Sequence, residues 1–235
     1  MIFSSKTLVL TLRRAAMTYA LRPGFVHAFA GIVATAALAA TALAAAPVHI
    51  VCLGDSLTAG YQLPADAAFP IVLEKALRAA GKNVDVANAG VSGDTSSGGL
   101  ERLNWSVPDG TDIVILELGA NDMLRGIDPK LTQTSLNTIM ARLNARHIRV
   151  LLAGMRATPG LGKDYASQFN AIFPNLAKKF DVPLVPFFLE GVAGHEALQL
   201  PDQMHPNRGG VEVIVRHMLP SVEAMLAEKS ADIKP

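Results

Sequence analysis

The chain has 235 residues, 50% of them hydrophobic, and its 21 lysines and arginines nearly balance its 20 aspartates and glutamates. This length and composition suit a folded protein with a substantial core, and the charge balance excludes the basic surface of a nucleic-acid-binding protein. The single cysteine, Cys52, excludes an intrachain disulfide and a zinc site built from several cysteines. We expect a buried structural thiol and no nucleic-acid partner.

Residues 1–44 differ in composition from the rest and predict a secretory signal peptide. Basic residues precede an alanine-rich apolar run with a small-x-small end: Arg13, Arg14 and Arg22, then Ala28–Leu43 and Ala42-Leu43-Ala44. The competing interpretation is an uncleaved membrane anchor, because the run approaches the ~20 apolar residues that span a bilayer. The alanines and the cleavage-like end favour removal, and Met17 is an alternative start. We expect a periplasmic or secreted bacterial protein with no stable membrane anchor after cleavage.

From Val48 onward, apolar runs of strand length alternate with amphipathic segments of helix length. The predicted strands are Val48–Leu53, Val84–Asn88, Asp112–Leu118, Arg149–Ala153 and Pro183–Phe188. The predicted helices are Phe69–Ala80, Leu131–Arg146, Tyr165–Phe180 and Gly209–Ala227. Alternation with mostly continuous apolar strands predicts an α/β fold, a parallel five-stranded sheet with helices on both faces. We expect one domain over residues 45–227 and a polar C-terminal tail over residues 228–235.

Short polar loops follow the first three predicted strands directly. They are Gly54-Asp55-Ser56, Gly90–Thr95 and Gly119–Asp122. Because parallel strands end at the same edge of a sheet, where open α/β sheets bind ligands, we expect these loops to converge. Asp55 and Ser56 alone also suit a helix N-cap. Three such loops at one edge indicate a site.

The segment Pro201-Asp202-Gln203-Met204-His205-Pro206-Asn207 supplies what a serine at a strand end lacks. A serine hydroxyl is a weak nucleophile that needs a base within hydrogen-bond reach, and that base needs a partner to orient it. Asp202 and His205 are three residues apart between prolines, so one tight turn can aim both side chains at the sheet edge. Among six histidines, His195 beside Glu196 is the one rival.

Attack of a serine on an acyl carbonyl creates an oxyanion, which needs hydrogen-bond donors. The candidate donors are the backbone N–H groups of Ser56 and Gly93 and the side-chain amide of Asn121. An ordinary turn glycine explains Gly93 alone, and an Asx-turn or helix cap explains Asn121 alone. Their positions at matching ends of successive strands favour a shared oxyanion hole.

Four sequence blocks of this chain resemble, in order, those of the SGNH (GDSL) hydrolases. They are Gly54-Asp55-Ser56-Leu57, Ser92-Gly93-Asp94-Thr95, Gly119-x-Asn121-Asp122 and Asp202-x-x-His205-Pro206-Asn207. The chain resembles in particular the bacterial periplasmic branch of thioesterase I/protease I/lysophospholipase and arylesterases. The resemblance implies a three-layer α/β/α sandwich of flavodoxin type, and it implies no cofactor or metal. It assigns catalytic residues as follows: nucleophile Ser56, other triad members Asp202 and His205, oxyanion hole Ser56, Gly93 and Asn121.

The sequence around Ser56 lacks the nucleophile elbow Gly-x-Ser-x-Gly of α/β-hydrolases, since Thr58 stands where the second glycine belongs. Apolar residues on or near the loops can form a groove for an acyl chain or an aromatic alcohol. They are Leu57, Tyr61, Leu63, Met123, Leu124, Ile127, Met155, Pro159 and Leu161. Arg125 and Arg156 are candidates for leaving-group contacts. Because the sequence shows no charged cluster that could bind phosphate or CoA, these apolar residues favour small to medium acyl or aryl esters as substrates.

The main hypothesis is therefore a secreted serine esterase or thioesterase that forms an acyl-enzyme on Ser56, as a monomer or small homo-oligomer. Acyl thioesters and lysophospholipids are further substrates to consider. The alternative is a carbohydrate O-deacetylase with the same triad, although one tryptophan and three tyrosines count mildly against stacking on sugars. A nucleotide- or flavin-binding module lacks both Gly-x-Gly-x-x-Gly and a Walker loop. A metal hydrolase would use Asp55, Asp94, Asp122 and His205.

Overall fold

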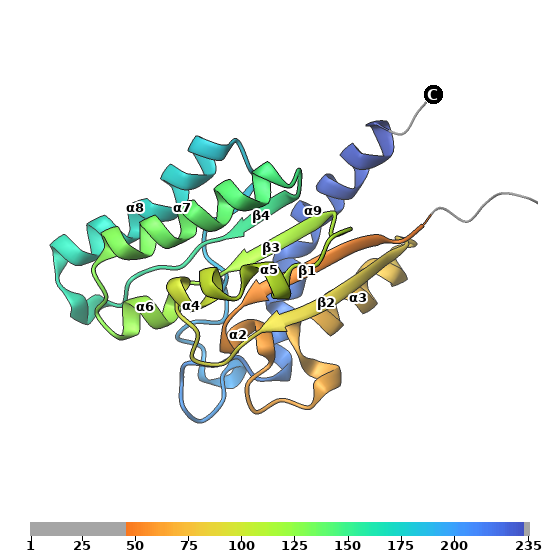
Figure 1. Cartoon of the computed structure of the whole chain (residues 1–235). Coiled ribbons are helices and arrows are strands. Elements are labelled where there is room, and N and C mark those ends of the chain that lie inside the picture. The colour runs from red at the N-terminus through yellow and green to blue at the C-terminus, as the bar shows by residue number, and fades with distance from the viewer. Residues whose placement is uncertain (1–45, 233–235) are drawn as a thin grey trace, which may run out of the picture. The chain divides into compact units, whose positions relative to one another are not determined.

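The structure is a computed structural model that describes residues 46–232, with side chains up to Ala227. Its centre is a sheet of five parallel strands in the order β2-β1-β3-β4-β5 (Figure 1). The strands are β1 (Val48–Gly54), β2 (Val84–Gly90), β3 (Ile113–Glu117), β4 (Arg149–Ala153) and β5 (Leu184–Val185). The predicted parallel five-stranded α/β fold is confirmed.

Helices cover both faces of the sheet (Figure 1). The pair α3 (Phe69–Ala79) and α9 (Arg208–Asp232) packs together on one face. The other face carries α4 (Ser96–Glu101), α5 (Leu103–Ser106), α7 (Pro129–Ala145) and α8 (Lys163–Phe180). Two short helices, α2 (Ser56–Ala59) and α6 (Ala120–Leu124), follow β1 and β3, and 3-10 turns lie at Ala65–Ala67, Pro159–Leu161 and Glu196–Leu198. The result is the expected three-layer α/β/α sandwich.

The burial of the strands follows their place in the sheet. Every residue of β3 is buried, and β1 is buried from Ile50 onward, as continuously apolar runs predict. The edge strand β2 instead buries Val84 and Val86 while it exposes Asp85, so only the inner strands fit that expectation. Cys52 is fully buried, and burial raises the pKa of its thiol, so the predicted structural thiol is confirmed.

Two boundaries differ from the sequence prediction. Strand β5 ends at Val185 rather than at Phe188, because Pro186 has no N–H to donate to a ladder and Phe188 instead bonds to the carbonyl of Gly154. Helix α9 runs to Asp232, so the segment expected as a polar tail begins as helix. The predicted signal peptide over residues 1–44 lies outside the described residues. Within residues 46–232, no helix is both long and apolar enough to cross a bilayer.

The carboxyl ends of the first three strands lie side by side, as predicted. Gly54 at the end of β1 pairs with Gly90 of β2 on one side and with Glu117 of β3 on the other. A Cβ atom at Gly54 would lie 2.6 Å from a carboxylate oxygen of Glu117, so only glycine fits between the strands. The loops after these strands therefore start from the same edge of the sheet. This edge includes the topological switch point between β1 and β3, where the strand order reverses.

Candidate active site

Ser56 is the first residue of α2, immediately after the turn that ends β1. Asp55 caps this helix, and its Oδ1 accepts a hydrogen bond of 3.0 Å from the backbone N–H of Leu57. The N-cap interpretation of Asp55 is therefore confirmed. As in the first turn of any helix, the N–H of Ser56 has no intrahelical acceptor. It thus remains available to a negatively charged oxygen beside the serine hydroxyl.

The structure brings Ser56, His205 and Asp202 into one hydrogen-bonded chain. His205 Nε2 lies 2.8 Å from Ser56 Oγ, and His205 Nδ1 lies 2.7 Å from Asp202 Oδ2. Because an ionised carboxylate only accepts hydrogen bonds, Nδ1 carries the ring proton of the neutral imidazole. Nε2 is then the unprotonated nitrogen, and it faces the serine hydroxyl as a base must.

A tight turn holds the histidine and the aspartate. Asp202 Oδ1 accepts hydrogen bonds of 3.0 Å from the backbone N–H groups of Met204 and His205. The N–H of Leu200 in turn donates to the carbonyl of His205, which fixes the turn from its other side. Partial burial by itself raises the pKa of Asp202, but these hydrogen bonds and the one from the His205 ring outweigh it and lower the pKa to about 2. Asp202 is therefore ionised at neutral pH.

Asn121 lies in α6 at the end of β3, and its Nδ2 donates a 2.9 Å hydrogen bond to Asp55 Oδ2. An amide nitrogen carries two hydrogens, so one N–H can be held by Asp55 while the other remains available. Burial raises the pKa of Asp55 to about 6, and the bonds from Leu57 and Asn121 act against this shift. The residue that caps α2 thus also orients the amide beside Ser56.

Gly93 occupies the third position of the turn Val91–Asp94, which is closed by a 3.1 Å bond from the N–H of Asp94 to the carbonyl of Val91. Its φ of +83° is the value that a type II turn requires there, so the turn-glycine interpretation holds. The carbonyl of Gly93 accepts a 2.6 Å bond from Arg125 Nη2, which makes Arg125 a support of this turn. The N–H of Gly93 has no acceptor within the described part of the chain.

A buried carboxyl that the sequence did not single out lies directly behind the turn that carries Ser56. Glu117 Oε2 accepts bonds of 2.7 Å from Thr58 Oγ1 and 3.3 Å from the N–H of Asp55, whereas Glu117 Oε1 is buried and has no hydrogen-bond partner among the described residues. Burial, and then the nearby charge of Asp55, raise the pKa of Glu117 well above its ordinary value. In the sequence, the only signal for this site was that Glu117 is a single acidic residue within an apolar run.

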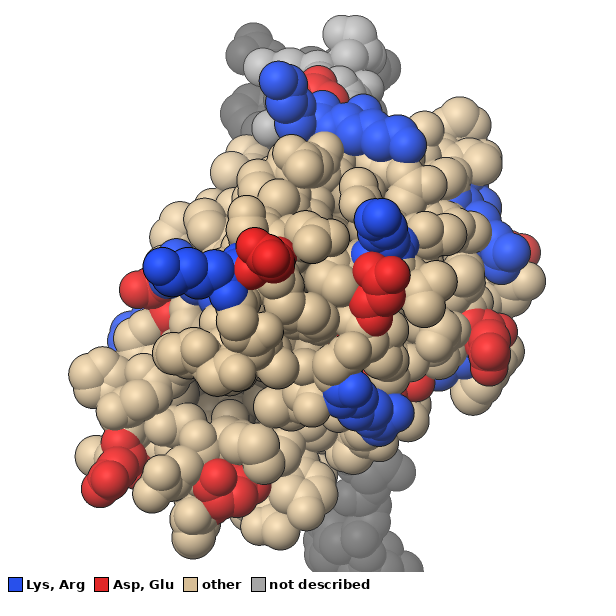
Figure 2. Space-filling model, turned by 90° about the vertical axis from the view of Figure 1, so that its left-hand side faces the viewer, with Lys and Arg blue, Asp and Glu red and all other residues tan. Residues whose placement is uncertain are grey.

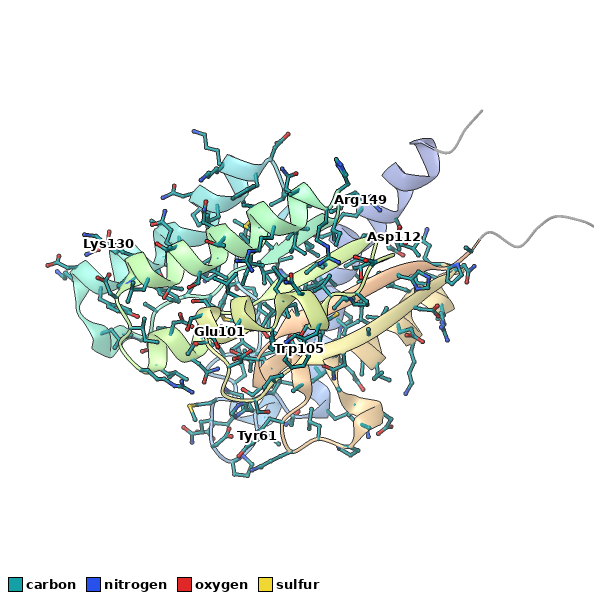
Figure 3. All side chains as sticks on the ribbon, in the orientation of Figure 1. Tyr61, Glu101, Trp105, Asp112, Lys130 and Arg149 are labelled. Carbon is teal, nitrogen blue, oxygen red and sulfur yellow. The ribbon has the colours of Figure 1, made fainter. Side chains whose placement is uncertain are left out.

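Because the pKa of Glu117 is raised, we expect the difference in stability between Glu117→Gln and the unchanged protein to depend on pH. A carboxyl whose pKa is higher in the folded than in the unfolded protein stabilises the fold at pH values below its unfolded-state pKa of about 4.3. This stabilisation is lost as the pH rises through its folded-state pKa. Glutamine does not titrate, so the Tm of the variant relative to the unchanged protein should rise from about pH 5 to about pH 8. Thermal melts across this range measure the difference. The exposed Glu101 (Figure 3) provides the matched control Glu101→Gln. A Tm difference that stays constant with pH would contradict the burial argument.

A cavity of about 380 Å³ opens beside the serine, with Ser56, Asn121 and His205 in its wall. Gly93 lies outside this lining. Four predicted groove residues line the cavity, namely Leu57, Met123, Leu124 and Met155, whereas Tyr61, Leu63, Ile127, Pro159 and Leu161 do not. Much of the remaining wall comes from the segment after β5, including Phe187, Leu189 and Met204. Figure 2 shows a hollow among mostly uncharged residues on this side of the molecule.

The structure adds to the sequence interpretation of two candidate substrate contacts, Arg156 and Tyr61. Arg156 lines it as expected, but its guanidinium lies 4.9 Å from the ring centre of Phe187 and 3.4 Å from the Glu190 carboxylate, so its charge is already paired. Tyr61, labelled in Figure 3, lies instead against His205, with ring centres 4.5 Å apart. Tyr61 therefore packs on the His205 ring rather than in the cavity.

The rival residues do not join this arrangement. His195 is exposed, and its side chain has no partner among residues 46–227. Asp94 pairs with Arg102, whereas Asp122 accepts bonds from Ser96 and from Thr132, so the four ligands of the metal-hydrolase interpretation do not converge. In the part of the chain with described side chains, no three His, Cys, Asp or Glu groups lie together as metal ligands.

The family comparison decides the identity of the fold and its chemistry. The model of the GDSL-like Lipase/Acylhydrolase family matches residues 52–213, a span that contains Ser56, Gly93, Asn121, Asp202 and His205. The chain belongs to this family. It is a carboxylic ester hydrolase, and the predicted resemblance to SGNH (GDSL) hydrolases is confirmed.

Three similar proteins support this membership. An arylesterase of Vibrio mimicus is 41% identical over 155 residues, covering 66% of this chain and 78% of its own. Thioesterase 1/protease 1/lysophospholipase L1 of Escherichia coli K12 is 38% identical over 188 residues, covering 80% of this chain and 89% of its own. The crystal structure of AlinE4, an SGNH-hydrolase family esterase, has 44% identity and a TM-score of 0.65 over 77% of this chain and 97% of its own. These relatives support an esterase or thioesterase, and none favours the O-deacetylase alternative.

Proposed function

We propose that this GDSL-family enzyme hydrolyses small to medium apolar acyl or aryl esters, and matching thioesters, through an acyl-enzyme on Ser56. The observation that carries the proposal is the chain of contacts of 2.8 Å and 2.7 Å from Ser56 through His205 to Asp202, at the wall of an apolar cavity. This is the arrangement of nucleophile, base and orienting acid that acyl transfer requires.

In the proposed first step, Ser56 Oγ attacks the acyl carbon while His205 Nε2 takes the hydroxyl proton. Asp202 is ionised, so it stabilises the imidazolium that forms and keeps the proton on Nδ1. Collapse of the tetrahedral intermediate expels the alcohol or thiol, which receives the proton from His205 Nε2. Water then attacks the acyl-enzyme with His205 again as base, which releases the acid and restores the serine.

The oxyanion of each tetrahedral intermediate is proposed to lie among three donors. These are the N–H of Ser56 at the start of α2, the N–H of Gly93 in its turn and the second N–H of the Asn121 amide. The N–H groups of Ser56 and Gly93 have no acceptor among the described residues, and Asp55 fixes the orientation of Asn121; both observations support this assignment. Preorganised donors of this kind stabilise the developing charge without reorganisation during the reaction.

Replacing Asn121 with alanine tests this hole. Loss of one donor should lower kcat by roughly 100- to 1000-fold, with a much smaller change in KM, because the donor acts mainly on the intermediate. Steady-state hydrolysis of a p-nitrophenyl ester measures both constants. Asn137→Ala, at a half-buried asparagine of α7 bonded to Lys179, is the control and should keep the original kcat. An unchanged kcat in Asn121→Ala would remove Asn121 from the hole.

The cavity indicates the substrate class. Its volume of about 380 Å³ lies near the lower end of the roughly 300 to 1,000 Å³ range of small-molecule sites, and its wall is mainly apolar. With Arg156 already paired to Glu190, the wall offers little to grip a strongly charged group. We therefore propose short to medium acyl chains as the preferred acids.

The test is a series of p-nitrophenyl esters from acetate through butyrate and octanoate to palmitate, with the octanoyl thioester in parallel. The proposal predicts that kcat/KM peaks at butyrate or octanoate and falls sharply at palmitate, which exceeds the cavity. A peak at acetate together with activity on acetylated sugars would instead support the O-deacetylase. No turnover of any ester or thioester would contradict the proposed function.

We also propose that residues 1–44 act as an export signal and that the working enzyme is periplasmic or secreted. The support is the composition of that segment. Intact-mass measurement after expression of the full chain in a Gram-negative host should find a product that begins near Ala45 in the periplasmic or culture fraction. A full-length product retained with the membranes would contradict removal of the segment.

A further inference from the structure

Arg102, at the junction of α4 and α5, is a buried arginine that the reaction itself does not use. It is 6% exposed, and its guanidinium donates four hydrogen bonds within the described structure. Nε bonds to Asp94 Oδ2 at 2.6 Å, and Nη2 bonds to the carbonyl of Gly54 at 2.8 Å. Nη1 bonds to the carbonyl of Ala89 at 2.8 Å and to Ser106 Oγ at 3.0 Å.

Three of these four acceptors belong to the edge that carries the site. The carbonyl of Gly54 lies two residues before Ser56, at the end of β1. The carbonyl of Ala89 lies at the end of β2, and Asp94 directly follows Gly93. One planar group therefore joins the nucleophile turn to the turn with the proposed second oxyanion donor.

We propose that Arg102 is a positioning residue that fixes the N–H of Gly93 relative to Ser56. The inference deepens the proposed function and rests on it. A guanidinium holds its donors in a rigid fork, so acceptors bound to one guanidinium are held at set distances from one another. A lysine ammonium offers three donors around one atom and cannot span the same acceptors.

The first test compares Arg102→Lys with the unchanged enzyme in p-nitrophenyl butyrate hydrolysis. Misplacement of a catalytic group by about 1 Å can slow a reaction by about 100-fold, so kcat should fall by roughly 10- to 100-fold. KM should change far less, because the acyl cavity keeps its lining. Arg149→Lys is the matched control. Arg149 is the first residue of β4, at the amino ends of the strands and away from the site, and it donates a hydrogen bond to the carbonyl of Met225. The control should keep the original kcat.

A double-variant cycle tests the route through Gly93. Gly93→Ala has room for its Cβ, whose nearest atom is Arg125 Nη2 at 3.6 Å, but the positive φ strains the turn and should displace the N–H. If Arg102 acts through this donor, adding Arg102→Lys to Gly93→Ala should lower kcat little further. Losses that multiply would overturn the inference, because Arg102 would then act independently of Gly93.

If Arg102→Lys fails to fold, two further variants test whether Arg102 positions the Gly93 turn. Asp94→Asn weakens the bond at the Gly93 turn, whereas Ser106→Ala removes the one bond that does not lead to the sheet edge. If Arg102 positions the Gly93 turn, we expect a lower kcat in Asp94→Asn and an unchanged kcat in Ser106→Ala. Equal kcat values for the two variants would overturn it.

The results separate this inference from the proposed function. Full activity of Gly93→Ala would contradict both the donor role of Gly93 and the role of Arg102. A slow Gly93→Ala beside a folded Arg102→Lys of full activity would overturn the role of Arg102 alone and leave the proposed oxyanion hole intact.

Discussion

Replacing Ser56 with alanine is expected to lower kcat by roughly 10⁶-fold, the size of effect found when a serine hydrolase loses its nucleophile. The reason is that no other hydroxyl occupies the place 2.8 Å from His205 Nε2 within the described part of the chain. The fold should persist, since the side chain of Ser56 makes only this one hydrogen bond there. Ester hydrolysis measures the loss, and a thermal melt checks the fold.

The control for this variant is Ser167→Ala, at an exposed serine of α8, which should keep the original kcat and Tm. A folded Ser56→Ala enzyme with more than a small fraction of the original turnover would contradict the acyl-enzyme mechanism. It would direct attention to water attack assisted by His205 alone.

Replacing Asp202 with asparagine should lower kcat by about 10⁴-fold without disrupting the turn. The asparagine Oδ1 can keep both backbone bonds, from Met204 and His205. Its Nδ2 then faces His205 Nδ1 as a donor, so Nδ1 must accept and the ring proton moves to Nε2. A protonated Nε2 cannot take the proton of Ser56.

This prediction is checked by kcat over a range of pH, together with the thermal melt. Because the pKa of Asp202 is about 2, its protonation should not limit the activity of the unchanged enzyme above about pH 4. A folded Asp202→Asn enzyme whose kcat stays within about tenfold of the original would show that Asp202 does not set the tautomer of His205.

The sequence predicted the parts of this molecule that depend on local pattern and on general chemistry. The strands β1, β3 and β4 follow directly from apolar runs, and parallel pairing brings the loops after β1 and β3 to one edge. Pairing Ser56 with His205 across 149 residues rested on what a serine nucleophile needs rather than on proximity in sequence.

The missed features depend on long-range packing. In the sequence, Glu117 and Arg102 each stand out only as a single charged residue. The register of β1 and β3 places Glu117 beside Gly54, and the junction of α4 and α5 brings Arg102 to the carbonyls of Gly54 and Ala89. The cavity wall after β5 has no periodic pattern, so Phe187 and Leu189 were not assigned to it. Tyr61 was placed in the groove because of its apolar ring, whereas the structure packs it on His205.

The proposed role of Ser56 as nucleophile is tested most directly by intact-mass and peptide-mapping spectrometry after treatment with a fluorophosphonate. An activated serine reacts with this reagent to form a stable adduct and lose fluoride. We expect one adduct per chain, located on the peptide that contains Ser56, absent from Ser56→Ala and accompanied by loss of ester turnover. No adduct, or an adduct on another residue while ester turnover persists, would contradict Ser56 as the nucleophile.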